Sequence, residues 1–147
     1  MKNSYHSEHI DSPESDYLFV EESQIPLSGN GLLTAIDIYE EEIIAVFRGE
    51  VLTKKEAKRR AELNQDQYFI NLLDGTILDS KHVSCFAKYA NDAAGAKFSP
   101  FRNNAFITTD DGGRACLVAK RDILSGEEIF CGYGSRYWKK HGKVSLV

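Results

Sequence analysis

The chain has 147 residues and a globular composition, with 42% hydrophobic and 27% charged residues. This length predicts one domain with a working core, and the composition argues against wholesale disorder. The longest apolar runs, residues 43–47 and 115–119, are too short for a transmembrane helix, and the polar N-terminus does not resemble a signal peptide. We therefore expect no association with a membrane.

The net charge of −4 is unevenly distributed. Five basic residues against two acidic ones give residues 53–62 a charge of +3, and four basic residues with no acid give residues 135–147 a charge of +4. Residues 1–15 carry −2, which leaves −9 for the rest of the chain. An acidic body attracts a cationic substrate through its field, although acidic residues also serve solubility.

The cysteines and histidines indicate neither a disulfide framework nor a metal centre. Cys85, Cys116 and Cys131 are odd in number, widely spaced and without a CxxC pair. The four histidines, at positions 6, 9, 82 and 141, have no metal-ligand spacing. We expect no metal and an intracellular, reducing compartment, with cytoplasm and nucleus both open.

The predicted elements begin after residues 1–15, a polar segment assigned to a flexible N-terminal tail. A first strand begins at residues 17–20, and Gly29-Asn30-Gly31 is typical of a turn. Residues 32–38 and 43–52 are predicted strands, joined by an acidic turn.

One clear helix follows. Thr53 and Glu56 have capping-box spacing, in which the threonine hydroxyl accepts from the amide three residues on and the glutamate returns the bond. Residues 57–63 suit a helix that ends near Asn64. Its basic face is more typical of a solvated surface than of a nucleic-acid site, because no aromatic residues interleave with the charges.

Two hairpins are predicted further on. Residues 67–79 turn at Asp74-Gly75, which is a strong two-residue turn signal, and residues 104–120 turn at residues 111–113. Many short strands with one clear helix predict a mostly β domain.

Near the C-terminus, residues 119–138 combine a charged strand end, a Ser-Gly turn and a short apolar run. Tyr133 follows, between Gly132 and Gly134. Because the glycines leave little neighbouring bulk, the tyrosine hydroxyl is able to face a ligand, although an aromatic core residue would give the same local pattern.

Four segments in this order resemble the SET domain of protein lysine methyltransferases: residues 29–38, 42–50, 87–92 and 119–138. The matching family patterns are a GxG loop, GE-I-x-x-Y-x-G-E, R-F/Y-I-N-H and RDI-x-x-GEEL-x-x-DYG. Without flanking Cys-rich segments, the chain resembles the minimal, zinc-free members. The resemblance implies a mostly β fold of several small sheets with few short helices, spanning residues 16–138 before a basic tail at 139–147.

The resemblance also implies a C-terminal pseudoknot, in which the segment around Tyr133 passes under the loop that holds Asn91. The implied activity is transfer of a methyl group from S-adenosylmethionine to a lysine side chain of a protein or peptide, with histones among the substrates and no direct binding of nucleic acid. Such a displacement needs an in-line geometry and a neutral amine, although free lysine has a pKa of about 10.4. A narrow aromatic channel favours the neutral amine by desolvation.

By resemblance, Tyr133 is the catalytic tyrosine, and Tyr68 and Phe47 line the lysine channel. The residues expected to bind the cofactor are Gly29, Asn30, Gly31, Leu32, Tyr89, Asn91, Asp92 and Trp138. Other roles stay open for some of them: a lone GxG is a weak signal, and Tyr68 and Trp138 also suit core packing.

Two positions depart from the family pattern. Phe47 replaces the usual tyrosine, and Asp92 replaces the histidine that follows the asparagine. The loop after Asp92 also differs, and Asn104-Ala105 is interpreted as the end of its motif after an insertion. The leading hypothesis is therefore an active methyltransferase, the alternative a degenerate, non-catalytic SET module that binds peptide or cofactor, and the third an unrelated small β interaction domain.

Overall fold

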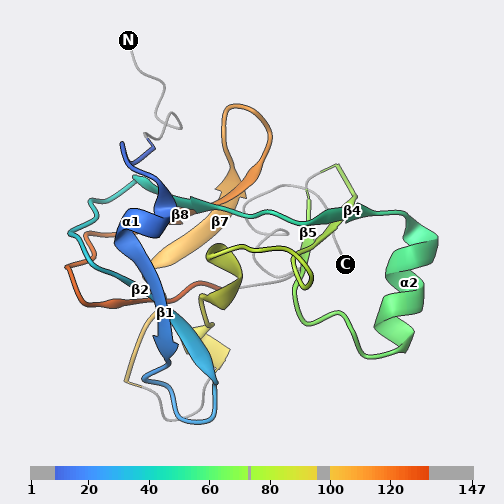
Figure 1. Ribbon diagram of the computed structural model, residues 1–147, viewed down its shortest axis with the longest axis horizontal. Coiled ribbons are helices and arrows are strands. Elements are labelled where there is room, and N and C mark those ends of the chain that lie inside the picture. Colours follow the sequence, from blue (N-terminus) through green and yellow to red (C-terminus); the bar gives the residue numbers. More distant parts are fainter. Residues whose placement is uncertain (1–8, 73, 96–99, 133–147) are drawn as a thin grey trace.

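The computed structural model describes residues 9–72, 74–95 and 100–132 (Figure 1). In chain order the elements are α1 (Glu14–Tyr17), β1 (Leu18–Glu22), β2 (Asn30–Thr34), β3 (Ile43–Val46), β4 (Glu50–Leu52), α2 (Lys54–Glu62), β5 (Phe69–Asn71), β6 (Ile77–Asp79), the short 3-10 helices η1 (Ala87–Tyr89) and η2 (Ala93–Gly95), β7 (Ala105–Thr109), β8 (Ala115–Ala119) and β9 (Glu128–Ile129). None of the described helices has the length and apolarity needed to cross a membrane.

The strands form three antiparallel sheets of three strands each, in the orders β1-β2-β9, β3-β8-β7 and β4-β6-β5. We call the first two sheets the main body, and the third sheet the small sheet. Helix α2 and the small sheet lie at one end of the molecule, and β1 and β2 lie at the other (Figure 1). The expectation of a mostly β fold with several small sheets is confirmed.

Most of the core of the molecule lies in the main body, and Ile70 and Leu78 of the small sheet extend it. Strands β3 and β8 are buried along their whole length. Their neighbours add further side chains with no exposed surface, among them Leu32 of β2, Ile107 of β7 and Ile129 of β9. An isolated bridge between Ile38 and Ile123, both fully buried, joins the two loops that flank these strands. Ile38 thus lies beyond the end of β2 at Thr34, although the sequence predicts one strand over residues 32–38.

The segment before β1 lies against β3. His9 forms a parallel bridge with Ile43, the Glu14 carboxylate accepts a hydrogen bond from Val46 N at 3.0 Å, and the Tyr17 hydroxyl donates to the Ile44 carbonyl at 2.6 Å. These contacts satisfy main-chain groups at the edge of β3, which would otherwise need water or another strand. Residues 9–15, which the sequence assigns to the tail, therefore contribute to the edge of the main body.

The predicted strand over residues 43–52 is divided into β3 and β4. At Gly49, between them, a Cβ atom would collide with the carbonyl oxygen of Asp79 and lie 3.0 Å from Ser80 N. Arg48 N donates to the Cys85 sulfur at 3.4 Å instead of to a strand partner. The chain leaves the main body at this point and crosses to the small sheet, a change of partner that the local pattern of apolar residues does not indicate.

Helix α2 starts at the residue that the sequence predicts, but the Glu56 side chain has different hydrogen-bond partners from those predicted. Thr53 is its N-cap, and its hydroxyl accepts from Glu56 N at 3.1 Å. Glu56 does not return a bond to Thr53; its carboxylate accepts from Arg59 and Arg60, with 2.7 Å to the nearest nitrogen of each. The capping box is therefore only half formed, because two guanidinium groups compete for the carboxylate.

The last described residues run between the two ends of the 92–104 loop. Phe130 bridges Asn91 and Cys131 bridges Ala105, both in parallel. Cys131 N donates to Asn91 O at 2.9 Å, and Ala105 N donates to Phe130 O at 3.0 Å. This arrangement agrees with the expected pseudoknot as far as Gly132, and Tyr133 lies outside the described residues.

Asn104 fixes this crossing. Its side chain is buried, donates to Glu128 O at 3.0 Å and accepts from Phe130 N at 2.8 Å. One amide group thus binds the main chain of the crossing segment on both sides of Ile129. The structure therefore gives a reason for asparagine at the end of the irregular loop motif.

Candidate active site

A partly open cavity of about 230 Å³ lies between the small sheet and the segment around Asn91. Its lining residues come from the link between β3 and β4, from β5, from the end of β6 and from η1 onward: Phe47, Gln67, Tyr68, Ile70, Ser80, Lys88, Ala90, Asn91 and Asp92. Four of these, Phe47, Tyr68, Asn91 and Asp92, are predicted from the sequence as site residues. The fold therefore brings together residues that are widely separated along the chain.

One wall of the cavity is aromatic. Phe47 is buried just after β3, and Tyr68 is half-buried just before β5. The main chain of Tyr68 is fixed because its carbonyl accepts from Ser80 N at 3.2 Å, which extends the pairing of β5 with β6. Phe47 brings no hydroxyl to this wall, so the wall is less polar there than the family pattern implies.

The opposite wall is joined to the glycine loop by Asn91. Its side-chain amide donates to Asn30 O at 3.0 Å. Gly31 is buried beside it, and a Cβ there would collide with the carboxylate of Glu128 and lie 3.2 Å from Ser23 Cα. The predicted cofactor residues Asn30, Gly31 and Asn91 are therefore neighbours in space.

Glu128, which the sequence did not single out, holds the other end of the glycine loop. This carboxylate is 2% exposed, accepts from Ser23 Oγ at 2.7 Å and accepts from Gln24 N at 2.8 Å. Gly29 adopts a φ of +72°, a conformation that favours glycine at the end of this loop. Leu32 is fully buried with no exposed surface, so the structure does not place it where a ligand would contact it.

Asp92 has a structural task in addition to its place in the cavity. Its Oδ1 accepts from Asn103 Nδ2 at 3.0 Å and from Ala94 N at 2.9 Å, which caps η2. A Cβ on Gly132 would lie 3.8 Å from Asp92 Oδ2. The carboxylate thus stabilises the altered loop and also places negative charge at the cavity wall.

Lys88 is one of five lining residues that sequence reasoning did not select as site residues, with Gln67, Ile70, Ser80 and Ala90. Its ammonium nitrogen lies 3.0 Å from Ser80 O, 3.1 Å from Val83 O and 3.4 Å from Lys81 O. It also lies 5.3 Å from the centre of the Tyr68 ring and 5.4 Å from that of Tyr89. The family pattern has arginine at this position, and that substitution was the signal available.

Three further predicted site residues, Tyr89, Tyr133 and Trp138, are not among the described residues that line the cavity. Tyr89 is half-buried against the core and contacts the cavity region through Lys88. Tyr133 and Trp138 lie outside the described residues. Among the described residues, no group of three or more histidine, cysteine, aspartate or glutamate side chains could hold a metal ion.

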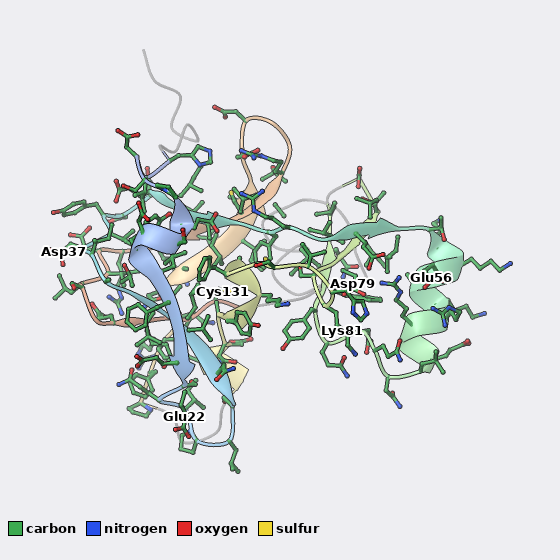
Figure 2. The ribbon with its side chains drawn as sticks, viewed as in Figure 1. Glu22, Asp37, Glu56, Asp79, Lys81 and Cys131 are labelled. Atoms are coloured by element: carbon green, nitrogen blue, oxygen red, sulfur yellow. The ribbon has the colours of Figure 1, made fainter. Side chains whose placement is uncertain are left out.

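A charged network holds the small sheet against α2. Arg60 donates to Glu50 at 3.0 Å, to Glu56 at 2.7 Å and to Asp79 at 2.8 Å. The Asp79 side chain is fully buried and also accepts from Lys81 N at 3.0 Å. In Figure 2, Asp79 lies toward α2 and Glu56 lies on the helix. Because Asp79 is followed by Ser80, this network anchors one edge of the cavity.

The network lowers the pKa of Glu50 and of Glu56. Hydrogen bonds from Arg59 and Arg60 lower the pKa of Glu56 to about 2, and the hydrogen bond from Arg60 lowers the pKa of Glu50. Both carboxylates are therefore ionised wherever the protein meets neutral solution.

Comparison with known proteins agrees with this geometry. The SET domain family model matches residues 29–134. The chain is 29% identical over 125 residues to "Histone-lysine N-methyltransferase EZH2" of Chaetomium thermophilum, which covers 78% of this chain and 8% of that protein. It is 27% identical over 110 residues to "Histone-lysine N-methyltransferase EZ1" of Zea mays, which covers 73% of this chain and 11% of that protein. The chain thus spans about a tenth of the length of these relatives. With the family model matched over most of its length, the chain belongs to the SET domain family.

Proposed function

We propose that this SET domain is an S-adenosylmethionine-dependent protein-lysine N-methyltransferase whose site is the described cavity. The observation that supports this proposal most directly is that one cavity is lined by four predicted site residues: Phe47, Tyr68, Asn91 and Asp92. The names of the two relatives support a protein substrate and make histones the first substrates to test. Family membership also rules out the reading of the chain as an unrelated β interaction domain.

The residues around Asn91 fit the cofactor. Asn91 uses its amide nitrogen on Asn30 O, which leaves its amide oxygen to accept from an ammonium group. Gly31 allows the glycine loop to lie against Glu128, because a Cβ there would collide with the Glu128 carboxylate. Asp92 adds a negative charge that suits a cationic ligand. When bound, S-adenosylmethionine would supply an electrophilic methyl group on a positively charged sulfur.

The chain's own residues would bind, orient and desolvate the substrate. Phe47 and Tyr68 offer an apolar wall that excludes water, and desolvation favours the uncharged form of a lysine amine. Holding the amine in line with the methyl group removes much of the entropic cost of the reaction. Tyr133 is proposed to place its hydroxyl near the reacting atoms, and Trp138 to contact the cofactor.

Two calorimetric titrations test the cofactor site. S-adenosylmethionine and S-adenosylhomocysteine should each bind and raise the melting temperature, as mass action requires. Gly31→Ala should weaken binding because its Cβ would displace Glu128, whereas Gly112→Ala, where the nearest atom is 3.5 Å away, is the matched control. No heat and no thermal shift at millimolar ligand would remove the enzyme proposal.

Methyl transfer is tested with labelled cofactor on histones and a panel of lysine peptides. Tyr133→Phe should lower turnover by about a hundredfold or more while cofactor affinity stays nearly unchanged. Turnover at the wild-type level in this variant would show that another tyrosine is catalytic. Cofactor binding without transfer to any substrate would favour the non-catalytic module, which the departures at Phe47 and Asp92 keep as the second candidate.

Location and other partners stay predictions. We propose an intracellular, reducing compartment because the cysteines of the sequence form no disulfide pattern. The three cysteines are buried in the structure, and burial raises the pKa of the Cys116 thiol to about 12. Direct binding of nucleic acid is not expected.

A further inference from the structure

Lys88 is the one cation in the described cavity lining, and its contacts reach both walls. It belongs to η1, three residues before Asn91, and so moves with the segment proposed to hold the cofactor. Its ammonium binds three carbonyls of the turn that follows β6, those of Ser80, Lys81 and Val83. The same turn also contacts Tyr68, because Ser80 N donates a hydrogen bond to the Tyr68 carbonyl.

The chemistry of the ammonium limits what Lys88 is able to do. A lysine ammonium has three donors, and three main-chain carbonyls take them, so no proton is left for a substrate or cofactor. Charge-assisted hydrogen bonds are stronger than neutral ones, and a cation over aromatic faces adds further attraction. Lys88 is therefore a fixed cross-link rather than a general base or a nucleophile.

We propose that Lys88 is a positioning residue that sets the aromatic lysine channel at Tyr68 against the cofactor segment at Asn91. This inference rests on the proposed methyltransferase function. In-line transfer depends on the relative placement of these two walls, and a shift of one ångström costs rate even when both ligands still bind. Among the described residues the Tyr68 side chain makes no hydrogen bond, and the Lys88 ammonium lies 5.3 Å from the centre of its ring.

A double-mutant cycle tests the coupling. Lys88→Met keeps the length of the side chain and removes the charge and the donors, and Tyr68→Leu removes the ring. Lys88→Met should lower kcat/KM for the peptide by about tenfold or more, with the cofactor Kd within about threefold of wild type. In the Tyr68→Leu background, Lys88→Met should lower kcat/KM little further, because the aromatic ring that Lys88 positions is already absent.

Two further variants complete the design. Lys88→Arg should restore most of the activity, since a guanidinium also donates to several carbonyls and stacks on aromatic rings. Lys58→Met, an exposed lysine of α2 that does not line the cavity, should leave kcat/KM unchanged. Additive losses in the cycle, or a fall in cofactor affinity as large as the fall in kcat/KM, would overturn the proposal, because either outcome describes a general structural role.

A measurement on the wild-type protein needs no variant and decides the case if Lys88→Met does not fold. Amine-reactive labelling followed by peptide mass spectrometry should modify Lys88 at least about tenfold more slowly than the exposed Lys58 and Lys120, because its donors are held by carbonyls. Labelling of Lys88 at the rate of these two lysines would overturn the cross-link. A wild-type chain that methylates no substrate would instead overturn the proposed function, and the positioning role with it.

Discussion

The main body and the small sheet share one apolar core, but the small sheet also depends on charged contacts with its neighbours. In the main body, Ile44, Leu117 and Ile129 have no exposed surface, and the core is apolar. In the small sheet, Ile70 and Leu78 are 4% and 8% exposed and belong to the same hydrophobic cluster as Ile44 and Leu117. There, the links to α2 and to the Asn91 segment come from the charged groups of Arg60 and Lys88.

This difference separates stability from geometry. Apolar burial in the main body is non-directional and contributes most of the stability of the fold. Charge-assisted hydrogen bonds at the small sheet are directional and fix how one wall of the cavity faces the other. We therefore expect substitutions in the main body to unfold the protein, and substitutions in the small sheet to misplace the site in a protein that remains folded.

The largest effect is expected for Leu117→Ala in β8. Removing a fully buried leucine from the main body should lower the free energy of unfolding by about 2–5 kcal/mol, from lost burial and the cavity left behind. Leu124→Ala, at a leucine that is 59% exposed, should change it by less than about 0.5 kcal/mol. Urea denaturation measures both, and equal losses would contradict the placement of the core.

The next effect is expected at the crossing of the chain. Asn104→Ala should cost about 2 kcal/mol of unfolding free energy, because Glu128 O and Phe130 N lose their buried partner. Asn71→Ala, at a half-buried asparagine of β5 in the small sheet, is the control and should cost less than half as much. If the two variants have the same denaturation midpoint, Asn104 does not hold the crossing.

Arg60→Met addresses the small sheet. It leaves the buried Asp79 carboxylate without its guanidinium partner, and we expect a local effect, since α2 and the small sheet are able to open while the main body stays folded. Hydrogen exchange of α2 amides should become at least about tenfold faster, with a much smaller change in β8. Lys58→Met on the same helix is the control, and uniform acceleration over the whole chain would show that the two regions unfold together.

Phe47→Tyr tests the cavity wall where Phe47, which follows β3 of the main body, lies beside the small sheet. This prediction rests on the proposed function. Wild-type enzyme should form products beyond monomethyl-lysine, because Phe47 makes the channel roomier and less polar. Fully buried Ile107 of β7 is likewise apolar. The added hydroxyl, costly to leave unpaired, should hold the amine or a water and shift the mixture toward monomethyl. Mass spectrometry of a peptide run to completion decides this, with Phe106→Tyr as control; monomethyl product alone from wild type would refute it.

The smallest effect is expected in acid. The folded-state pKa of Glu56 is about 2 against an ordinary value of 4.5, so the unfolded chain binds more protons between these values. The contribution of Glu56 is therefore complete above about pH 4.5 and is lost as the pH falls toward about 2. Hydrogen exchange followed from pH 5 to pH 2.5 should show that α2 loses protection as the pH falls. In Glu56→Gln this loss of protection should depend less on pH. An identical profile in the two proteins would exclude Glu56 as its source.

Local sequence signals predicted the elements whose causes are local. Thr53 is the N-cap of α2 because a threonine hydroxyl three residues before an amide satisfies it wherever the helix lies. Asp74 and Gly75 lie in the expected hairpin turn, where Gly75 has a φ of +89°. The turn is longer than the predicted two residues, because Asn71 pairs with Ile77 and Leu72 N donates to Thr76 O at 2.8 Å. Short helix α1 was missed, because its contacts with β3 are made across the fold.

The order of four motifs along the sequence by itself determined the family, the mostly β class and the residues proposed to bind cofactor and substrate. Only the tertiary structure decided that β3 ends at Val46, that Glu56 binds arginine instead of closing its capping box, and that Lys88 joins the two walls. Each of these depends on a partner far along the chain or on competition between partners. The spacing of residues along the sequence does not show which of the competing contacts forms, because the folded structure decides between the possible partners.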